Sequence, residues 1–408
     1  MRIAIFTNNY LPNPYGVSGS IESFRKELER MGHTVYVFAP NFKGYVDENE
    51  NACPSERRVF RYPAIDFKFK DIRFPIAIPY SCLGGRQAYR ISRLLKKLEL
   101  DIIHCQHPNL LGWAGAKWSK KKKVPLIFTW HTLYNHYAHF APLLPEKFAA
   151  NWAIKNARNF ANAANCIIVP TPSVKEMILR WGVSNKNIVS IPSGVNGSEF
   201  ENADKESVRK ELEIAEDEVA LLLVSRITDE KNVIFLANVI ARVLSEDKES
   251  NLNKIKFILA GDGNKLSEIK KIFSHAGVDE KVSYLGLIAG ERRKNVYAAG
   301  DIFVYASKSE TQGMIISEAM YMGLPVVALS ATGVNDMITN QVTGLLVKEN
   351  EQEFAMAIRR LVNDEKLRKK FSENAGKISR QWYTSAVCTQ RLISLYEKTI
   401  LESKERKN

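Results

Sequence analysis

The chain has 408 residues, enough for two or three domains, and its 45% hydrophobic and 10% aromatic content excludes a wholly disordered protein. Its net charge of +13 is uneven, because residues 51–150 hold 17 basic and 6 acidic side chains while residues 201–408 hold 31 of each. The sequence has no run of about 18 apolar residues and no secretory leader, so we expect a cytoplasmic protein without membrane spans. Its cysteines have no paired spacing, so we expect neither disulfides nor structural zinc.

Short apolar runs alternate with amphipathic stretches along the chain. The first series of predicted strands comprises residues 3–6, 35–38, 102–103, 126–129 and 167–169. The second series comprises residues 219–224, 257–260, 302–305, 325–328 and 344–347. Strands that alternate with helices form parallel sheets covered on both faces. The sequence therefore predicts an α/β fold with two doubly wound, Rossmann-like parallel-sheet domains that face each other across a cleft.

The polar, acid-rich stretch between the two series separates these domains. We place the first domain at residues 1–197, a linker at 198–214 and the second domain at 215–375. Residues 376–408 follow as a helical segment that we expect to pack back on the first domain. Ligands of such sheets bind beyond the carboxyl ends of the strands, so the loops there are the candidate sites.

The loop after the first strand leads into a helix through Gly16, Ser18, Gly19 and Ser20. Backbone N–H groups and hydroxyls at a helix N-terminus favour an anion. The spacing is neither a P-loop nor the dinucleotide fingerprint, so an ordinary turn with an N-cap is the alternative.

Two basic residues, Arg226 and Lys231, bracket the turn after the strand at 219–224. A guanidinium and an ammonium that converge there would clamp a diphosphate. The alternative is a surface ion pair of these residues with Asp229 or Glu230.

Two glutamates, Glu310 and Glu318, surround Gly313 after the strand at 302–305. Gly313 permits close approach of the backbone to a ligand at the start of a helix, and carboxylates accept hydrogen bonds from vicinal diols. Helix capping by Glu310 and a solvated helix face for Glu318 are the alternatives.

Five of the seven histidines cluster between residues 104 and 139, and His131 directly follows the strand at 126–129. They lie on different segments without a carboxylate or cysteine at ligand spacing, so we expect no metal site and a polar role for His131. His104 and His107 either line the same cleft or cap it.

A basic helix lies within the positively charged region. Arg86, Arg90, Arg93 and Lys97 share one face of it, and leucine and isoleucine side chains share another. The preceding segment, residues 67–80, mixes apolar and basic side chains around prolines and is expected to be a loop. This pattern suits an anionic membrane surface, an ordinary helix packed on the sheet, or nucleic acid. Nucleic acid is the least favoured of these, because aromatics are not interleaved with the lysines.

Taken together, these loops resemble the family-four glycosyltransferases of the GT-B fold over essentially the whole chain. Glu310, Gly313 and Glu318 are similar to the two-glutamate motif of that family, and Arg226 with Lys231 to its donor-diphosphate pair. Gly16 matches its glycine loop. Gly194-Val-Asn matches its domain-joining segment, and Ala260-Gly-Asp-Gly263 a glycine-rich turn.

The resemblance implies retaining transfer of a sugar from a nucleotide diphosphate sugar, without an essential metal or other cofactor. It assigns acceptor binding to the first domain and nucleotide-sugar binding to the second. Arg226 and Lys231 would neutralise the diphosphate, Glu318 would bind the ribose, and Glu310 would hold sugar hydroxyls. The backbone N–H groups of Gly313, Met314 and Ile315 would assist, and His131 would lie near the anomeric carbon.

A narrower resemblance concerns the acceptor. Residues 129–140, which include Tyr134 and Tyr137, and residues 309–313 look like those of the bacterial diacylglycerol glucosyltransferases, which are peripheral membrane enzymes. We therefore expect transfer of a hexose, glucose from UDP-glucose, to a diacylglycerol-type lipid at the inner membrane leaflet, without nucleic acid or an obligate protein partner. The alternatives are a related enzyme with another lipid or a soluble acceptor, and a nucleic-acid-binding protein with a vestigial sugar site.

Overall fold

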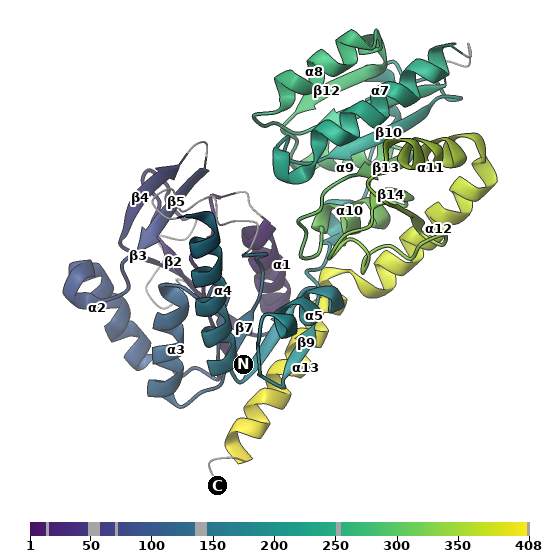
Figure 1. Ribbon diagram of the computed structural model, residues 1–408. Helices are drawn as coiled ribbons and strands as arrows, with labels where there is room; N and C mark the ends of the chain where they lie inside the picture. Colours follow the sequence, from purple (N-terminus) through teal and green to yellow (C-terminus); the bar gives the residue numbers. More distant parts are fainter. Residues whose placement is uncertain (14–15, 48–57, 70–71, 135–144, 250–253, 406–408) are drawn as a thin grey trace. The chain divides into compact units, whose positions relative to one another are not determined.

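A computed structural model describes residues 1–13, 16–47, 58–69, 72–134, 145–249 and 254–405. The chain forms two compact units (Figure 1). The first comprises Met1–Ser193 together with Cys388–Asn408, and the second comprises Gly194–Val387. Each unit is built on a parallel sheet covered by helices, which confirms the predicted α/β fold of two parallel-sheet domains.

The first unit is built on a seven-stranded sheet in the order β3-β2-β1-β6-β7-β8-β9. Its strands are β1 (Arg2–Phe6), β2 (Thr34–Pro40), β3 (Val59–Tyr62), β6 (Ile102–Cys105), β7 (Leu126–Thr129), β8 (Cys166–Val169) and β9 (Ile188–Ser190). All neighbouring strands are parallel. The direction of winding reverses between β1 and β6, and the loops after the carboxyl ends of two such strands are where sheets of this kind bind their ligands.

Successive side chains of β1 point to opposite faces of this sheet, and each face has its own core. Ala4 and Phe6 join the core of one face, and Ile3 and Ile5 that of the other. The first core contains residues of α2 (Ser81–Lys97), α3 (Leu111–Lys122), α4 (Glu146–Ala163) and α5 (Pro172–Arg180). The second contains residues of α1 (Gly16–Arg30) and α13 (Ser385–Glu405).

The segment expected to be a loop, residues 67–80, is largely an antiparallel hairpin. Its strands are β4 (Ala64–Phe69) and β5 (Ile72–Ala77), with Asp66 opposite Pro75. Apolar and charged residues alternate along β4, which is the period of a strand, and the two strands form a sheet of their own. Pro75 fits this position because a strand of a two-stranded sheet has a free edge that needs no N–H donor.

The second unit is built on a six-stranded parallel sheet in the order β12-β11-β10-β13-β14-β15. Its strands are β10 (Val219–Val224), β11 (Ile255–Ala260), β12 (Val282–Gly286), β13 (Ile302–Tyr305), β14 (Val326–Leu329) and β15 (Gly344–Val347). Here the winding reverses between β10 and β13, which are direct neighbours in the sheet.

The helices of the second unit are α6 (Lys205–Glu211), α7 (Val233–Glu249), α8 (Leu266–His275), α9 (Gly290–Ala299), α10 (Met314–Tyr321), α11 (Glu351–Asn363) and α12 (Glu365–Trp382). Helices α7 to α10 connect successive strands of this sheet, whereas α6 precedes β10 and α11 and α12 follow β15. Figure 1 shows α7 to α12 around the sheet. Short 3-10 turns are η2 (Gly197–Glu199), η3 (Asp229–Lys231) and η4 (Asp279–Lys281). Buried residues from most of these helices and from the strands form one continuous core.

The unit boundaries differ from the predicted ones at both ends of the second domain. Residues 198–214, expected to be a linker, belong to the second unit because Phe200 and Val208 are buried in its core. The expected C-terminal segment from residue 376 is split, because α12 continues to Trp382 within the second unit and only Cys388–Asn408 joins the first. No helix among the described residues is long and apolar enough to cross a bilayer.

The packing of α13 on the first unit leads to a stability prediction. Leu392 is 1% exposed within the core that α13 shares with β1, whereas Leu401 on the same helix is 60% exposed. We expect Leu392→Ala to lower the free energy of unfolding of the first unit by about 2–5 kcal/mol, because it leaves a cavity. Urea unfolding followed by fluorescence measures this change in the free energy of unfolding. Leu401→Ala is the matched control, for which we expect a change near zero. Equal effects of the two substitutions would contradict the packing of α13.

Candidate functional site

Lys231 and Glu310 form an ion pair at the carboxyl ends of the two strands where the second sheet reverses. Lys231 ends η3 after β10, and Glu310 lies in the loop after β13. The Lys231 Nζ is 2.5 Å from the Glu310 Oε1, and each side chain is 13% exposed. Loops that follow adjacent parallel strands meet at one edge of the sheet, so residues 79 positions apart come into contact.

Glu310 accepts two further hydrogen bonds from residues that the sequence patterns did not single out. The Tyr305 hydroxyl donates at 2.5 Å and the Ser307 hydroxyl at 2.9 Å, both to Oε1. Burial alone would raise the pKa of Glu310, but the Lys231 charge and these hydrogen bonds outweigh it and lower the pKa. The carboxylate is therefore ionised at neutral pH, and Glu310 is no helix cap.

A serine fastens the two loops to each other. The Ser309 hydroxyl donates to the backbone carbonyl of Glu230 at 3.1 Å, and the Ser307 hydroxyl, which donates to Glu310, lies 3.4 Å from the same carbonyl oxygen. This carbonyl lies between Arg226 and Lys231 in the sequence, so Ser309 fixes the turn that carries the two basic residues.

A glycine turn after β11 supports the same loop from the other side. A Cβ at Gly261 would lie 1.8 Å from the Ser225 carbonyl oxygen, and one at Gly263 would lie 2.3 Å from that of Ile227. The Ile227 N–H also donates to the Asp262 carbonyl at 2.9 Å. The glycines predicted as a family turn thus hold the backbone on either side of Arg226 in place.

The side chain of Arg226 is more exposed to solvent than that of Lys231. Arg226 pairs with Glu230, as the alternative interpretation predicted, and its side chain is 40% exposed. Arg226 lies between β10 and η3, and Lys231 is the last residue of η3, so both cations belong to the connection between β10 and α7. A paired and exposed arginine can exchange its carboxylate partner for an anionic ligand at little cost.

Gly313 begins the helix that follows Glu310. Its φ of 76° lies in the left-handed region that favours glycine, and it is the N-cap of α10. Met314 and Ile315 are the first residues of that helix, where backbone N–H groups have no partner within a helix. A Cβ at Gly313 would lie 3.6 Å from the Cγ of Glu310, so the positive end of α10 is adjacent to Glu310.

Gly333, after β14, is a further residue that the sequence patterns did not reveal. A Cβ there would lie 2.5 Å from the Glu310 carbonyl oxygen and 2.8 Å from the carbonyl carbon of Thr311. Its φ is 77°. The Gly333 backbone therefore lies directly against the backbone that carries Glu310.

Glu318 lies on the second turn of α10 and contacts α9 instead of the Lys231 pair. The Tyr297 hydroxyl donates to its Oε2 at 2.9 Å, and the Arg293 Nη1 is 3.4 Å from its Oε1. Burial raises the pKa of Glu318, although Arg293 and Tyr297 oppose the shift. The side chain is not on a solvated helix face.

The histidines of the first unit have separate roles. The His131 Nε2 is 2.6 Å from the Gln106 Oε1, and because an amide oxygen only accepts, Nε2 carries the hydrogen. Burial and the neighbouring His107 and His104 lower the pKa of His131 to about 3, so its ring is neutral. His107 follows β6 and accepts from the Asn8 N–H at 3.2 Å, at the reversal point of this sheet.

His104 lies within β6 and does not belong to a loop. Its Nδ1 is 2.6 Å from the Tyr396 hydroxyl on α13, and its Nε2 is 2.6 Å from Thr129 Oγ1. Burial lowers the pKa of His104 to about 3. This neutral ring therefore connects α13 to the sheet.

Gly16 is the first residue of α1, and a Cβ there would meet nothing within 4 Å. Tyr134 packs against the buried Trp130, with ring centroids 5.4 Å apart. Tyr137 lies outside the described residues.

The basic helix is amphipathic, as the sequence predicted. Arg86, Arg90, Arg93 and Lys97 are all exposed on α2. Its apolar face packs on the sheet through Ala88, Ile91 and Leu95, so that face is not free for a membrane. Apolar side chains that remain exposed on α2 are Leu83, at 74%, and Tyr89, at 55%.

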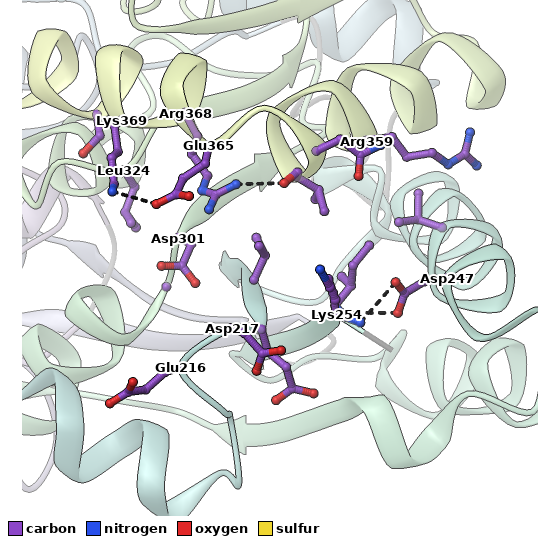
Figure 2. A pocket seen from close by; sticks show the side chains of 18 of the residues that line it. Glu216, Asp217, Asp247, Lys254, Asp301, Leu324, Arg359, Glu365, Arg368 and Lys369 are labelled. Atoms are coloured by element: carbon purple, nitrogen blue, oxygen red, sulfur yellow. Dashed lines mark hydrogen bonds and ion pairs between the residues drawn. The ribbon is translucent and has the colours of Figure 1, made fainter. Parts of the chain in front are cut away.

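A large pocket of about 1070 Å³ lies at the opposite edge of the second sheet (Figure 2). Its lining includes Val219 and Ile255, the first residues of β10 and β11, and none of the predicted site residues. Its charged groups pair within the unit, for example Arg359 with Glu246 and Lys369 with Glu365. Among the described residues, no group of three or more His, Cys, Asp and Glu side chains is placed to hold a metal.

The close approach of Gly333 to the Glu310 loop leads to a second stability prediction. We expect Gly333→Ala to cost more than about 2 kcal/mol of unfolding free energy, because backbone atoms must move and the new residue is strained. Gly277→Ala is the matched control, since Gly277 also has a positive φ, of 63°, but has no atoms within 4 Å of its Cβ position. Thermal unfolding measures both, and an equal shift for the two variants would contradict the packing described here.

Comparisons with known proteins agree with the two units. The model "Glycosyltransferase Family 4" matches residues 14–199, and "Glycosyl transferases group 1" matches residues 204–378. The crystal structure of Anabaena HepE in complex with UDP and glucose has the same fold, with a TM-score of 0.74 and 19% identity over 98% of this chain and all of that one.

Curated relatives extend this similarity. The alpha-monoglucosyldiacylglycerol synthase of Streptococcus pneumoniae is 31% identical over 95% of this chain and 86% of its own, and that of Acholeplasma laidlawii is 28% identical over the whole of both. The GDP-mannose-dependent alpha-mannosyltransferase of Mycobacterium tuberculosis is 26% identical over 97% of this chain and 96% of its own. Each unit has a parallel sheet whose winding direction reverses, and in the second unit two basic residues lie beside the segment with the two glutamates. The family model and relatives that match nearly the whole chain agree with this arrangement. The chain therefore belongs to the family-four glycosyltransferases.

Proposed function

We propose that this glycosyltransferase is a retaining hexosyltransferase that moves glucose from UDP-glucose to a diacylglycerol-type lipid at the inner leaflet of the membrane. The observation that carries the donor part is the Lys231–Glu310 pair at the reversal point of the second sheet, next to the N-terminus of α10. The names of the two synthases from S. pneumoniae and A. laidlawii support the lipid acceptor.

In this proposal the cations of the β10 turn bind the diphosphate of the donor. Arg226 and Lys231 and the first N–H groups of α10 stabilise the negative charge that develops on the leaving group. These fixed charges serve the purpose that a metal ion serves in other transferases, so we propose that the reaction needs none. Glu310 accepts hydrogen bonds from sugar hydroxyls, and Glu318 accepts them from the ribose.

The proposed reaction takes place on one face of the sugar. The acceptor hydroxyl oxygen forms a bond to the anomeric carbon while the bond from that carbon to the phosphate oxygen breaks. The electron pair of the broken bond stays on the diphosphate, and the acceptor proton moves to the departing phosphate oxygen. Glu310 is held by Lys231, Tyr305 and Ser307, so it orients the sugar instead of attacking it. The neutral His131 contributes its backbone carbonyl and a polar ring near the acceptor.

Exposed groups of the first unit support a lipid surface. Arg86, Arg90 and Arg93 are exposed on α2 together with Tyr89. Leu83 is exposed just before the break that Gly85 makes in this helix, where φ is 58° and ψ is −149°. Cations beside apolar side chains suit an anionic membrane, where charge attracts the protein and apolar groups enter the interface. The basic charge of residues 51–150 then serves to place the acceptor site at the membrane.

A second candidate is a related enzyme that uses another nucleotide sugar or acceptor. The mannosyltransferase of M. tuberculosis, whose name specifies GDP-mannose, matches nearly the same length of chain and favours it. The diphosphate and ribose contacts proposed above are common to both donors, so they do not distinguish the two. A screen of nucleotide-sugar donors with diacylglycerol vesicles as acceptor distinguishes the two candidates by the masses of the products.

Substitution of Lys231 is the first test of the donor site. We expect Lys231→Ala to lower kcat/KM by about 10²–10³-fold, since an electrostatic partner of the transition state is lost. Lys308→Ala is the matched control, because Lys308 lies in the Glu310 loop but is 52% exposed and pairs with Glu349. We expect the control to change kcat/KM by less than about threefold. Full turnover of Lys231→Ala or of Glu310→Gln would refute the assignment.

Vesicle binding tests the acceptor side. We expect Arg86/Arg90/Arg93→Gln to weaken binding to phosphatidylglycerol vesicles by about 10²-fold, because each basic residue near an anionic surface contributes roughly 1 kcal/mol. Binding to neutral phosphatidylcholine vesicles should change little. The control Lys366/Lys369/Lys370→Gln removes the same charge from exposed positions of α12 in the second unit. Activity indifferent to anionic vesicles and to the α2 substitutions would contradict the lipid surface.

A further inference from the structure

Arg293 on α9 connects two carboxylates from separate segments of the second unit. Its Nη1 is 3.4 Å from the Glu318 Oε1 on α10, and its Nη2 is 2.6 Å from the Glu199 Oε2 on η2. Its guanidinium also lies over the Phe200 ring, 5.0 Å from the centroid. A planar guanidinium held by a carboxylate and an aromatic ring has a fixed orientation, so its other edge meets Glu318 in a defined geometry.

The surroundings of Glu318 make this contact important. From α9, Arg293 and the Tyr297 hydroxyl face it, and from η2 the Glu199 charge opposes its ionisation. On the side of α12, Ser379 donates to the Ser317 carbonyl and Arg380 lies over the Tyr321 ring. Within the described part of the chain, Arg293 is the cation that pairs with this buried carboxylate.

The two oxygens of Glu318 are engaged differently. Oε1 faces Arg293 and Oε2 accepts from Tyr297. A carboxylate has about four lone-pair sites, so each oxygen keeps one further acceptor site. These two sites match the two hydroxyls of a vicinal diol.

We propose that Arg293 is a positioning residue for the nucleotide ribose: it holds the Glu318 carboxylate charged and oriented so that it accepts hydrogen bonds from both ribose hydroxyls. Glu199 and Phe200 hold Arg293 in turn. The inference rests on the ribose role proposed for Glu318. It adds a residue that touches neither sugar nor phosphate and acts on donor affinity through another side chain.

The test is a double-mutant cycle on UDP affinity, measured by calorimetry with the full chain. We expect Arg293→Gln to weaken UDP binding by about tenfold and Glu318→Gln by at least as much. In the Glu318→Gln background, Arg293→Gln should have little further effect, because residues that act through one another are not additive. Binding of 2′,3′-dideoxy-UDP should be almost indifferent to Arg293→Gln, since the ligand lacks both hydroxyls.

Two controls separate positioning from folding. Arg292→Gln changes the neighbouring arginine, which pairs with Glu211 on α6, and should leave UDP affinity unchanged. Arg293→Lys keeps the charge and should restore part of the affinity. Circular dichroism and the unfolding midpoint identify any variant that fails to fold, and Arg293→Lys then completes the cycle.

The pH dependence gives an independent result. Burial raises the pKa of Glu318, so UDP affinity falls as the pH falls through that value. Loss of Arg293 raises this pKa further, so the acidic decline of Arg293→Gln should begin at higher pH than in the wild type. The same decline should be absent from Glu318→Gln.

The outcomes distinguish this inference from the proposed function. Failure of the wild-type protein to bind UDP would overturn both. Normal UDP binding, with Arg293→Gln equally harmful in the presence and absence of the Glu318 carboxylate, would overturn the positioning role alone. An unchanged pH profile and an equal loss for the dideoxy ligand would do the same.

Discussion

The site depends on a largely buried ion pair, Lys231–Glu310, formed between the segments that follow the two strands at the reversal point of the second sheet. Two charges removed from water lose hydration, and their attraction restores that loss only when the remaining hydrogen-bonding groups are satisfied. Here Tyr305 and Ser307 donate to the same carboxylate oxygen as Lys231. An ion pair of this kind adds little net stability to the fold. Its charges instead give the site a preorganised surface for a polar ligand.

The surrounding backbone is arranged around this pair. Gly261 and Gly263 support the turn with Arg226, and Gly333 supports the Glu310 backbone, in each case where a Cβ would meet a carbonyl. Ser309 joins the two loops through the Glu230 carbonyl. Main-chain contacts thus fix the positions of the charged groups. Backbone atoms move less than the ends of long side chains, so these contacts hold the groups more precisely than side-chain contacts would.

The sequence predicted the parts of this site that follow from periodicity and motif spacing. Buried runs located the ten predicted strands, and Arg226, Lys231, Glu310 and Gly313 all lie in loops at their carboxyl ends. Gly333 and Arg293 were missed because each acts through a contact with a residue of another loop or helix. Tyr305 was missed although its partner Glu310 is only five residues away. A tyrosine at the end of a buried strand is an ordinary core residue until its hydroxyl partner is known. The hairpin at β4 and β5 was missed because prolines suggested a loop. The break after Trp382 was missed because residues 376–408 were predicted as one helical segment.

The first unit shows how one residue type takes different roles. His104 connects β6 to α13 through a hydroxyl 292 residues away, whereas His131 pairs with Gln106 beyond the end of β7. Both rings are neutral because burial disfavours their charged form. Clustering in the sequence could not separate the structural histidine from the candidate one, since the difference is that His104 lies within β6 whereas His131 follows the end of β7.

The most direct test of the central claim is thermal unfolding with and without UDP, for the wild type and for Lys231→Met/Glu310→Gln. A pair kept for ligand binding predicts that the double variant unfolds at the same or a higher temperature without UDP, because the variant has no lone charge and the glutamine amide oxygen still accepts from Tyr305 and Ser307. It also predicts that the stabilisation by UDP seen in the wild type disappears. A double variant that is much less stable yet still stabilised by UDP would show that the pair serves the fold and not the donor.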